Sequence, residues 1–508
     1  MSQTSIAALL TLGAAYRHPF LPVLALALAI VAAPHALAQQ VTIGGDSNPS
    51  DPATVDGSVD LTIGQNGTGA LDIKDGGTLT DGTGFVGNHD GSVGNVTLSS
   101  SNGSVSTWIN AGDLVVGQNG TADLTIQDSS EVTNQNGYIG ATTGSVSRTV
   151  APSNVTVSGS GSTWSNSSQL FVGDAGTGEL DILGGGLVES GIGLVGNQNG
   201  GNGAVTVSGY GSYWNNSNQI DICNEGTGTL SVENGGMVTS SEGDIGGTTG
   251  SADTGDGTVT VSGNDGDGHA STWNTGNVYV GFMGTGRFNI FDGGLVTSDG
   301  GGGAAATGYI GYSSGSTGIV TVSSSTGDVS TWTVTNDIEV GVDGVGTLNV
   351  EKGGKVHVAT DVTIGVNAGS SGRLNLLGDT SGRGVLETGS VIKGDGTAIF
   401  NFNGGILRAT RDETDFLQNF GTQAISIGAN GAVIDTNGYD IGIAPRFDGT
   451  GGLTKDGAGT LALTGTSTYT GPTDVNAGSL LVNGSIANSA VLVHDRASCQ
   501  APAPSAPR

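Results

Sequence analysis

Apolar residues along this chain occur in short pairs separated by one residue, and many of the pairs end at a glycine. The segments LVVG (114–117), LFVG (170–173), VYVG (278–281) and IEVG (338–341) are of this kind. Alternation with a period of two predicts β-strands that bury one face. A glycine at the end of each pair predicts a tight corner with a positive φ before the next strand.

Five tryptophans recur at similar intervals and mark a longer repeat. They are Trp108, Trp164, Trp214, Trp273 and Trp332. A second apolar pair begins ten residues after the first in each repeat, at Leu124, Leu180, Leu230, Phe288 and Leu348. Between tryptophans, a valine takes the third apolar position, as Val132 and Val188 do. Each repeat therefore divides into two half-repeats with three short strands apiece.

Three short strands cannot bury their apolar side alone, but stacked half-repeats can. The sequence therefore predicts an all-β fold, a right-handed parallel β-helix (β-solenoid) with roughly 25-residue coils and three strands per coil. Twelve coils are expected from Leu61 to about Thr388, which at ~4.8 Å per coil make a rod of roughly 60 Å. Tryptophan falls in alternate coils, so each indole should lie between aliphatic residues such as Val132 and Val188.

The segment 1–38 has the features of a secretory signal peptide. The apolar run at 20–33 is shorter than the ~20 residues of a membrane-spanning helix, and cleavage is expected between Ala38 and Gln39. The rest of the chain is divided into a capping segment at 39–60, Trp-marked solenoid repeats at 61–388, irregular solenoid coils at 389–450, a separate repeat at 451–493 and a disordered non-repeat tail at 494–508. Within the irregular coils, 411–420 is expected to form a short helix or a loop.

The Trp-marked units resemble a repeat shared by passengers of type V secretion (autotransporters) and some PEP-CTERM exported proteins. Residues 452–486, GLTKDGAGTLALTGTSTYTGPTDVNAGSLLVNGSI, closely resemble the autotransporter-associated β-strand repeat. The resemblance implies a β-helical passenger that is secreted or held at the cell surface or outer membrane of a Gram-negative bacterium. It also implies an outer-membrane β-barrel translocator, which is absent from this chain. A truncated gene, a stand-alone secreted protein and a separate barrel all stay open as explanations.

Composition narrows the possible functions. The chain has 95 glycines in 508 residues and 12% charged residues, well below the roughly 25% of an ordinary globular domain. Its 45 acidic and 15 basic residues give a formal net charge of −30 at pH 7. A surface so negative repels nucleic acid, so we expect no nucleic-acid partner. The two cysteines form no disulfide framework.

No residue set predicts a catalytic site, a cofactor site or a metal site. Gly45-Asp46-Ser47 resembles the nucleophile loop of chymotrypsin-like autotransporter proteases, but the domain that would supply the base is not present upstream. The histidines at 89, 269, 357 and 494 lack metal-ligand spacing, and 265–269 is interpreted as an acidic loop. Cys223 replaces a corner glycine and is interpreted as a tolerated, unreactive variant.

The middle residues of the second strands should face solvent and form a polar ladder. They are Asp72, Thr97, Thr125, Thr156, Asp181, Thr206, Ser231, Thr260, Asn289, Thr321, Asn349 and Asn375. The ladder is either a solvated β face or a docking surface. The sequence and the resemblance together favour a non-enzymatic, rod-like surface adhesin, aggregation or surface-structure protein. Its partners would be host or bacterial surface glycans or proteins, or further copies of itself. A β-helical polysaccharide hydrolase with two carboxylates ~6.5–9.5 Å apart and an inert stalk are the alternatives.

Overall fold

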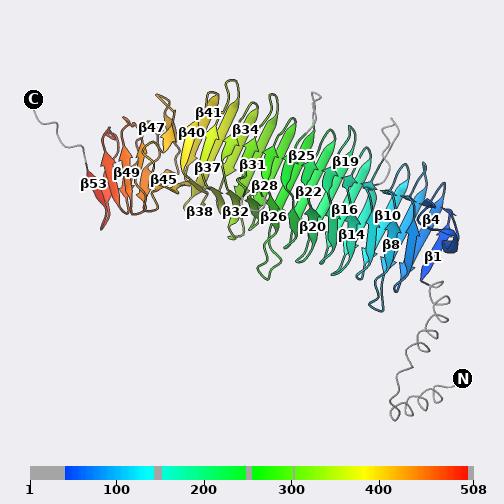
Figure 1. Cartoon of the computed structure of the whole chain (residues 1–508). Coiled ribbons are helices and arrows are strands. Elements are labelled where there is room, and N and C mark those ends of the chain that lie inside the picture. The colour runs from blue at the N-terminus through cyan, green and yellow to red at the C-terminus, as the bar shows by residue number, and fades with distance from the viewer. Residues whose placement is uncertain (1–39, 142–151, 248–254, 301–303, 501–508) are drawn as a thin grey trace, which may run out of the picture.

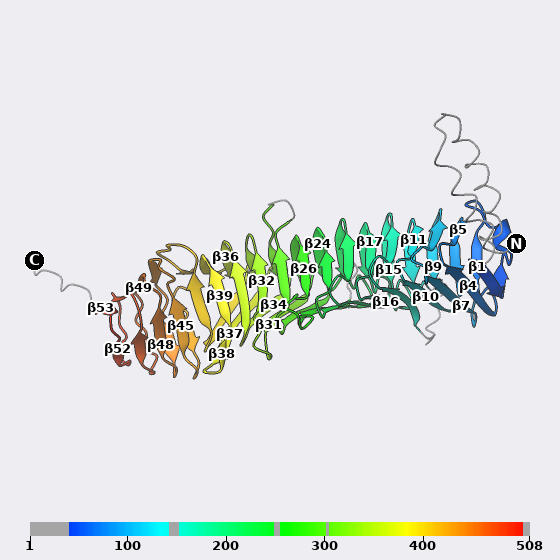
Figure 2. The same cartoon turned by 90° about the horizontal axis from the view of Figure 1, so that it is seen from below.

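A computed structural model describes residues 40–141, 152–247, 255–300 and 304–500. The chain winds into a stack of coils that forms a long rod, with β1 near one end and β53 near the other (Figures 1 and 2). Each of the first twelve coils gives one strand to each of three sheets, and neighbouring coils pair in parallel. The predicted parallel β-solenoid, with twelve coils between Leu61 and Thr388, is confirmed.

The three sheets have the following strands. Sheet B takes the first strand of each coil: β2 (Ser47–Asn48), β3 (Leu61–Ile63), β6 (Gly84–Val86), β9 (Leu114–Val116), β12 (Gly137–Ile139), β15 (Gln169–Val172), β18 (Ile192–Val195), β21 (Gln219–Ile222), β24 (Glu242–Ile245), β27 (Asn277–Val280), β30 (Gly308–Ile310), β33 (Ile338–Val340), β36 (Asp361–Ile364), β40 (Ser390–Lys393) and β43 (Leu417–Gln418). Sheet A takes the second: β1 (Val41–Gly45), β4 (Thr68–Lys74), β7 (Val93–Ser99), β10 (Thr121–Gln127), β13 (Ser153–Ser158), β16 (Thr177–Leu183), β19 (Asn202–Ser208), β22 (Thr227–Glu233), β25 (Asp256–Ser262), β28 (Thr285–Phe291), β31 (Thr317–Ser323), β34 (Val345–Val350), β37 (Ser371–Asp379), β41 (Thr397–Asn403), β44 (Ile425–Ile427) and β47 (Phe447–Gly449), with β38 (Gly382–Arg383) as a hairpin on β37. Sheet C takes the third: β5 (Thr78–Asp81), β8 (Thr107–Asn110), β11 (Glu131–Asn134), β14 (Thr163–Asn166), β17 (Leu187–Ser190), β20 (Tyr213–Asn216), β23 (Met237–Thr239), β26 (Thr272–Thr275), β29 (Leu295–Ser298), β32 (Ser330–Val334), β35 (Gly354–Val358), β39 (Val385–Thr388), β42 (Ile406–Ala409), β45 (Ala432–Asp435), β48 (Leu453–Asp456), β50 (Thr473–Val475) and β52 (Val491–Val493).

The N-terminal end of the rod is closed by a segment that runs against the direction of the coils. Strand β1 pairs antiparallel with β4, and β2 pairs antiparallel with β3. A 3-10 helix, η2 (Pro52–Thr54), follows β2. These pairings occupy the edges of sheets A and B in the first coil, which would otherwise present unpaired backbone groups.

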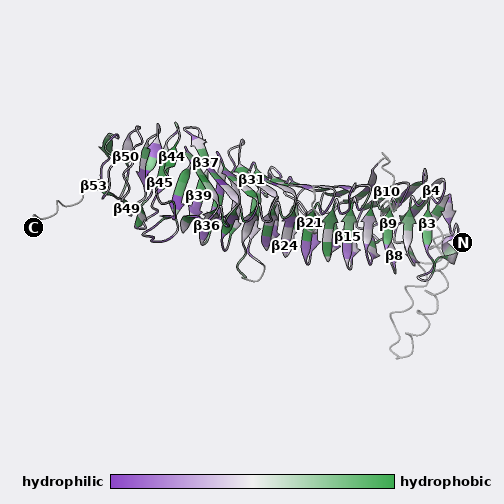
Figure 3. Ribbon diagram, turned by 90° about the horizontal axis from the view of Figure 1, so that it is seen from above, coloured by the Kyte–Doolittle hydropathy of each residue, from purple (hydrophilic) through white to green (hydrophobic). Residues whose placement is uncertain are grey.

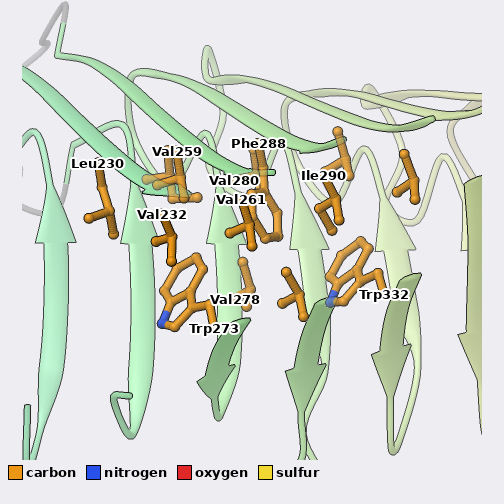
Figure 4. Close-up of a cluster of buried hydrophobic side chains, with 14 of the residues drawn as sticks. Leu230, Val232, Val259, Val261, Trp273, Val278, Val280, Phe288, Ile290 and Trp332 are labelled. Carbon is orange, nitrogen blue, oxygen red and sulfur yellow. The ribbon is translucent and has the colours of Figure 1, made fainter. Parts of the chain in front are cut away.

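The core lies inside the coils and is filled by the alternate residues that the sequence marks. The five tryptophans, with Leu124, Leu180, Leu230, Phe288 and Leu348, are at most 1% exposed. Hydrophobic and hydrophilic residues alternate along the strands (Figure 3). Val132 pairs in register with Trp108 on one side and Trp164 on the other, and Val188 pairs with Trp164 and Trp214. The other tryptophans also have aliphatic register neighbours on both sides, which confirms the prediction within sheet C. Phe288 of sheet A packs edge to face on both Trp273 and Trp332, and Figure 4 shows these two indoles as separate rings.

The C-terminal coils are smaller than the Trp-marked ones. In sheet A, Thr177 lies opposite Asn202 of the next coil. Between β49 (Thr460–Leu463) and β51 (Ser479–Val482), Thr460 lies opposite Ser479, so one turn of the rod takes fewer residues there. Sheet A ends at β47, and a separate sheet of β46 (Ile441–Ile443), β49, β51 and β53 (Ser498–Gln500) continues the rod.

Three further predictions concern the ends of the chain and the irregular coils. Strand β53 pairs in parallel with β51, so the solenoid continues to Gln500 instead of giving way to a disordered tail at 494. Residues 411–420 form a loop with the short strand β43 and no helix. The expected cleavage site at Ala38 and Gln39 lies outside the described residues.

Candidate binding surfaces

The outer face of sheet A carries the predicted polar ladder. All twelve of its residues are partly exposed. Several of them bond to one another along the rod: Asn349 Nδ2 donates to Thr321 Oγ1 (3.2 Å), and Asn375 Nδ2 donates to Asn349 Oδ1 (2.7 Å). The amide and hydroxyl groups of this ladder are therefore partly satisfied within the protein itself.

The outer face of sheet C carries an ion network near the middle of the rod's C-terminal half. Glu387 on β39 accepts from Lys355 Nζ (3.0 Å), His357 Nδ1 (3.1 Å) and Arg408 Nη1 (2.8 Å), and Arg408 Nε also bonds Asp435 (2.7 Å). Burial alone would raise the pKa of Glu387, but the hydrogen bonds from Lys355 and Arg408 lower the pKa below its usual value. Positive and negative groups match here, so the network joins four coils and leaves little charge for a partner.

The outer face of sheet B holds stacked aromatic rings beside a pair of buried carboxyl groups. Tyr138 on β12 stacks on Phe171 on β15, with ring centroids 4.6 Å apart. Two coils further on, Asp221 on β21 lies opposite Asp244 on β24 in the register. Both are at most 5% exposed. Burial raises the pKa of Asp221 to about 6, and burial beside Asp221 and Glu242 raises the pKa of Asp244 to about 8.

An aromatic patch follows directly on this acidic pair. We define it as Tyr279 on β27, Tyr309 on β30, and Phe282 and Tyr312, each of which follows the glycine corner after one of these strands. Tyr279 stacks on Tyr309 (4.7 Å) and Phe282 stacks on Tyr312 (5.2 Å). The two stacks meet edge to face, with Tyr279 5.0 Å from Phe282. All four rings are partly exposed.

A buried polar column lies inside the coils, at the end of the sheet C strands. Trp164 Nε1 donates to Asn134 Oδ1 (2.6 Å), and Trp332 Nε1 donates to Ser298 Oγ (3.1 Å). Asp81 takes this position beside Trp108, but its carboxyl oxygens have no hydrogen bond of ordinary geometry among the described residues. Burial raises the pKa of Asp81 to about 7, although the nearby indole of Trp108 acts in the opposite direction. The column thus accepts the indole N–H groups of Trp164, Trp214, Trp273 and Trp332.

The sequence motifs that were candidates for a chemical role make structural contacts instead. The Asp46 carboxylate accepts from the backbone N–H groups of Asn66 and Gly67, and Ser47 Oγ donates to the Gly44 carbonyl (2.9 Å), so Gly45-Asp46-Ser47 is a hydrogen-bonded turn. Cys223 is buried at a corner with φ +71°, and its thiol lies 2.8 Å from the Gly226 carbonyl.

His269 is held within the acidic loop. Its Nδ1 lies 2.6 Å from an Asp265 carboxylate oxygen, and its ring stacks on Tyr210 with centroids 3.8 Å apart. Across the described ranges, no group of three or more histidine, cysteine, aspartate or glutamate side chains is arranged to hold a metal ion. The same ranges contain no helix that is long and apolar enough to cross a membrane.

The acidic pair does not have the geometry that a glycoside hydrolase needs. Asp221 and Asp244 are register neighbours and hydrogen-bond to each other through their side chains. An inverting hydrolase separates its carboxyl groups by ~6.5–9.5 Å to admit a water and keeps them open to substrate. Both groups are instead almost fully buried.

Comparison with known proteins indicates which kind of protein this chain resembles. Residues 453–482 match the passenger-associated-transport-repeat model. The chain is also 34% identical over 139 residues to a protein named Adhesin BmaC autotransporter from Brucella suis biovar 1 (strain 1330), and the match covers 26% of this chain and 4% of that relative. With its continuous parallel solenoid, this repeat and this relative, the chain resembles the passengers of autotransporters.

Proposed function

We propose that this chain is an autotransporter passenger that acts as a rod-like adhesin or aggregation protein at the surface of a Gram-negative bacterium. The observation that carries the proposal is that three outer faces run side by side along the stacked coils from β3 to β45. Such a rod offers many weak contacts in series, and their avidity replaces a deep pocket. The adhesin name of the relative supports the same role, although the chain spans only 4% of that protein.

The test is display of residues 40–500 on a non-adherent Gram-negative strain, followed by measurement of aggregation and of attachment to host cells. We expect a gain in one or both over cells that carry the display scaffold alone. The matched variant lacks residues 177–226, which removes two coils and joins Gly176 to Thr227 in the same register as Gly176 to Thr177. Because fewer contacts act in series, attachment should fall but not vanish. No gain over the scaffold would contradict the adhesive function.

A further inference from the structure

Carboxyl groups lie at both ends of the aromatic patch of Tyr279, Phe282, Tyr309 and Tyr312. On one side Asp244 is opposite Tyr279 in the register, with Glu242 two residues earlier on the same strand. On the other side Glu339 on β33 is opposite Tyr309.

None of these carboxyl groups is neutralised by a cation in the described part of the chain. The ion pairs found there join other residues, and Glu387, for example, pairs with Lys355 and Arg408. Burial is the largest cause that raises the pKa of Glu242 and of Glu339, and the negative charge of Asp337 raises the pKa of Glu339 further. The carboxyl groups of Glu242 and Glu339 therefore lack an internal counter-charge, and a bound cation would lower their raised pKa values.

A second observation concerns Asp244 itself. The residue is 5% exposed, and its Oδ1 atom has no hydrogen-bond partner among the described residues. A buried carboxyl oxygen without a donor is uncommon in folded proteins, because the loss of hydration is not compensated. This unsatisfied acceptor stands directly beside the outermost ring of the patch.

We propose that this face of sheet B binds an extended, arginine-rich polypeptide segment, an inference that rests on the proposed adhesive function and names the chemistry of its partner. A guanidinium group is planar, stacks on aromatic rings and bonds carboxylates through two N–H groups at once. The patch and its bordering carboxyl groups offer both kinds of contact side by side. The net charge of −30 attracts a cationic partner from a distance and repels an anionic one.

The length of the face favours a polypeptide over a small cation. The acceptors and rings are spread over β24, β27, β30 and β33, which are successive strands of sheet B. Three steps of ~4.8 Å separate the first strand from the last, so a single ammonium group contacts one step only. A chain with several arginines reaches Glu242 and Glu339 together.

The probe for the test is a fluorescein-labelled ten-residue peptide of alternating arginine and glycine, titrated with the full chain in ~0.15 M salt, where weak long-range attraction is largely screened. The first variant is Glu242→Gln with Glu339→Gln. Its matched control is Glu131→Gln with Glu179→Gln, which removes the same charge from partly exposed positions on sheets C and A. We expect the first variant to bind about fivefold more weakly and the control to stay within about twofold.

A second variant, Tyr309→Leu, removes a ring and leaves the charge unchanged. Weaker peptide binding with the same salt dependence is expected if guanidinium stacking contributes. The inference is overturned by equal losses in the two glutamine variants, by no peptide binding, or by displacement of the peptide with tetramethylammonium at peptide-like concentrations. If the chain mediates cell attachment but does not bind the peptide, this inference alone is overturned. Peptide binding by a chain that attaches to no cell would overturn the adhesive function alone.

Discussion

The Trp-marked coils and the C-terminal coils fill the same interior column in opposite ways. In sheet C the column passes through Trp332, Val356 and Leu386, and then through Leu407 and Ile434. The next residue in the register is Lys455, which is 0% exposed. A charged side chain therefore occupies the position that an indole fills in coils nearer the N-terminus.

The difference follows from the length of a coil. A Trp-marked coil has three strands and encloses a wide interior, so it needs a large apolar side chain and a polar acceptor for the indole. The C-terminal coils are shorter, lose the sheet A strand and bring backbone corners close to the column. Lys455 Nζ then reaches the carbonyls of Asp456 (2.9 Å), Gly457 (2.7 Å) and Ala477 (3.0 Å), besides Thr436 Oγ1 (3.1 Å). A buried charge is tolerated where its hydrogen bonds are saturated.

The largest effect should come from a cavity in the wide coils. Trp273→Ala removes a 0% exposed indole that packs edge to face on Phe288 at 5.5 Å. We expect a loss of about 3–5 kcal/mol in the free energy of unfolding, measured by urea titration. Because each coil contacts only its neighbours, new proteolytic cleavage should cluster near coils β24 to β31.

Trp273→Phe is the control, since it keeps an aromatic ring and should recover much of the stability. A loss below about 1 kcal/mol for the alanine variant would show that the wide coils collapse around the gap, and that indole volume does not set their size.

The next largest effect concerns Lys455. Lys455→Met keeps the length of the side chain but removes the donor to four oxygens, so we expect a loss of about 3 kcal/mol that is confined to the C-terminal coils. Hydrogen exchange should show faster opening of β48 to β53, with the Trp-marked coils unchanged. Lys393→Met is the matched control, because Lys393 also donates to two carbonyls but is only partly buried. Equal effects of both substitutions would mean that saturation of the buried ammonium is not what holds the narrow coils.

A smaller effect is expected at the first tryptophan. The pKa of Asp81 is raised from 3.8 to about 7 by burial, so between about pH 4 and pH 7 the folded chain binds a proton that the unfolded chain has lost. Stability should therefore fall as the pH rises through this range. Asp81→Asn copies Asn134 and does not titrate, so it should stabilise the chain by roughly 2 kcal/mol at pH 8 and by almost nothing at pH 4. A stability difference that stays constant from pH 4 to pH 8 would contradict the buried, titrating carboxyl.

The coil register could be predicted from the sequence because inward residues are periodic. Apolar positions such as those of Leu124, Val132 and Trp164 recur in each repeat, and their apolar character indicates which side of the strand is buried. The polar column of Asp81, Asn134 and Ser298 was missed because asparagine and serine normally indicate turns or solvent. Its signal was present, since from β5 to β29 a polar residue lies two positions after the inward residue of each sheet C strand.

The aromatic patch was also missed, for a different reason. Tyr279 lies at the middle position of VYVG, and only the flanking valines were needed to define the strand. Tyr309 and Tyr312 lie one coil after Tyr279 and Phe282. The two ring stacks therefore form only when successive coils pack in the rod. The loss of the sheet A strand after β47 likewise depends on packing between coils, and apolar spacing alone does not show it.

The smallest effect tests the corner that glycine normally occupies. Gly173 and Gly281 have φ near +69°, and Cys223 adopts φ +71° at the equivalent corner, where a side chain costs roughly 1 kcal/mol. The thiol offsets part of that cost through its contact with the Gly226 carbonyl (2.8 Å). Cys223→Gly should therefore gain only about 0.5 kcal/mol, whereas Cys223→Ala keeps the strain and should lose stability.

Burial raises the pKa of the Cys223 thiol to about 11, so alkylation of the native chain at pH 8 should modify the exposed Cys499 and spare Cys223, as mass spectrometry would show. Rapid modification of Cys223 would mean that this corner opens in the folded rod and that the wide coils are less tightly closed than their core implies.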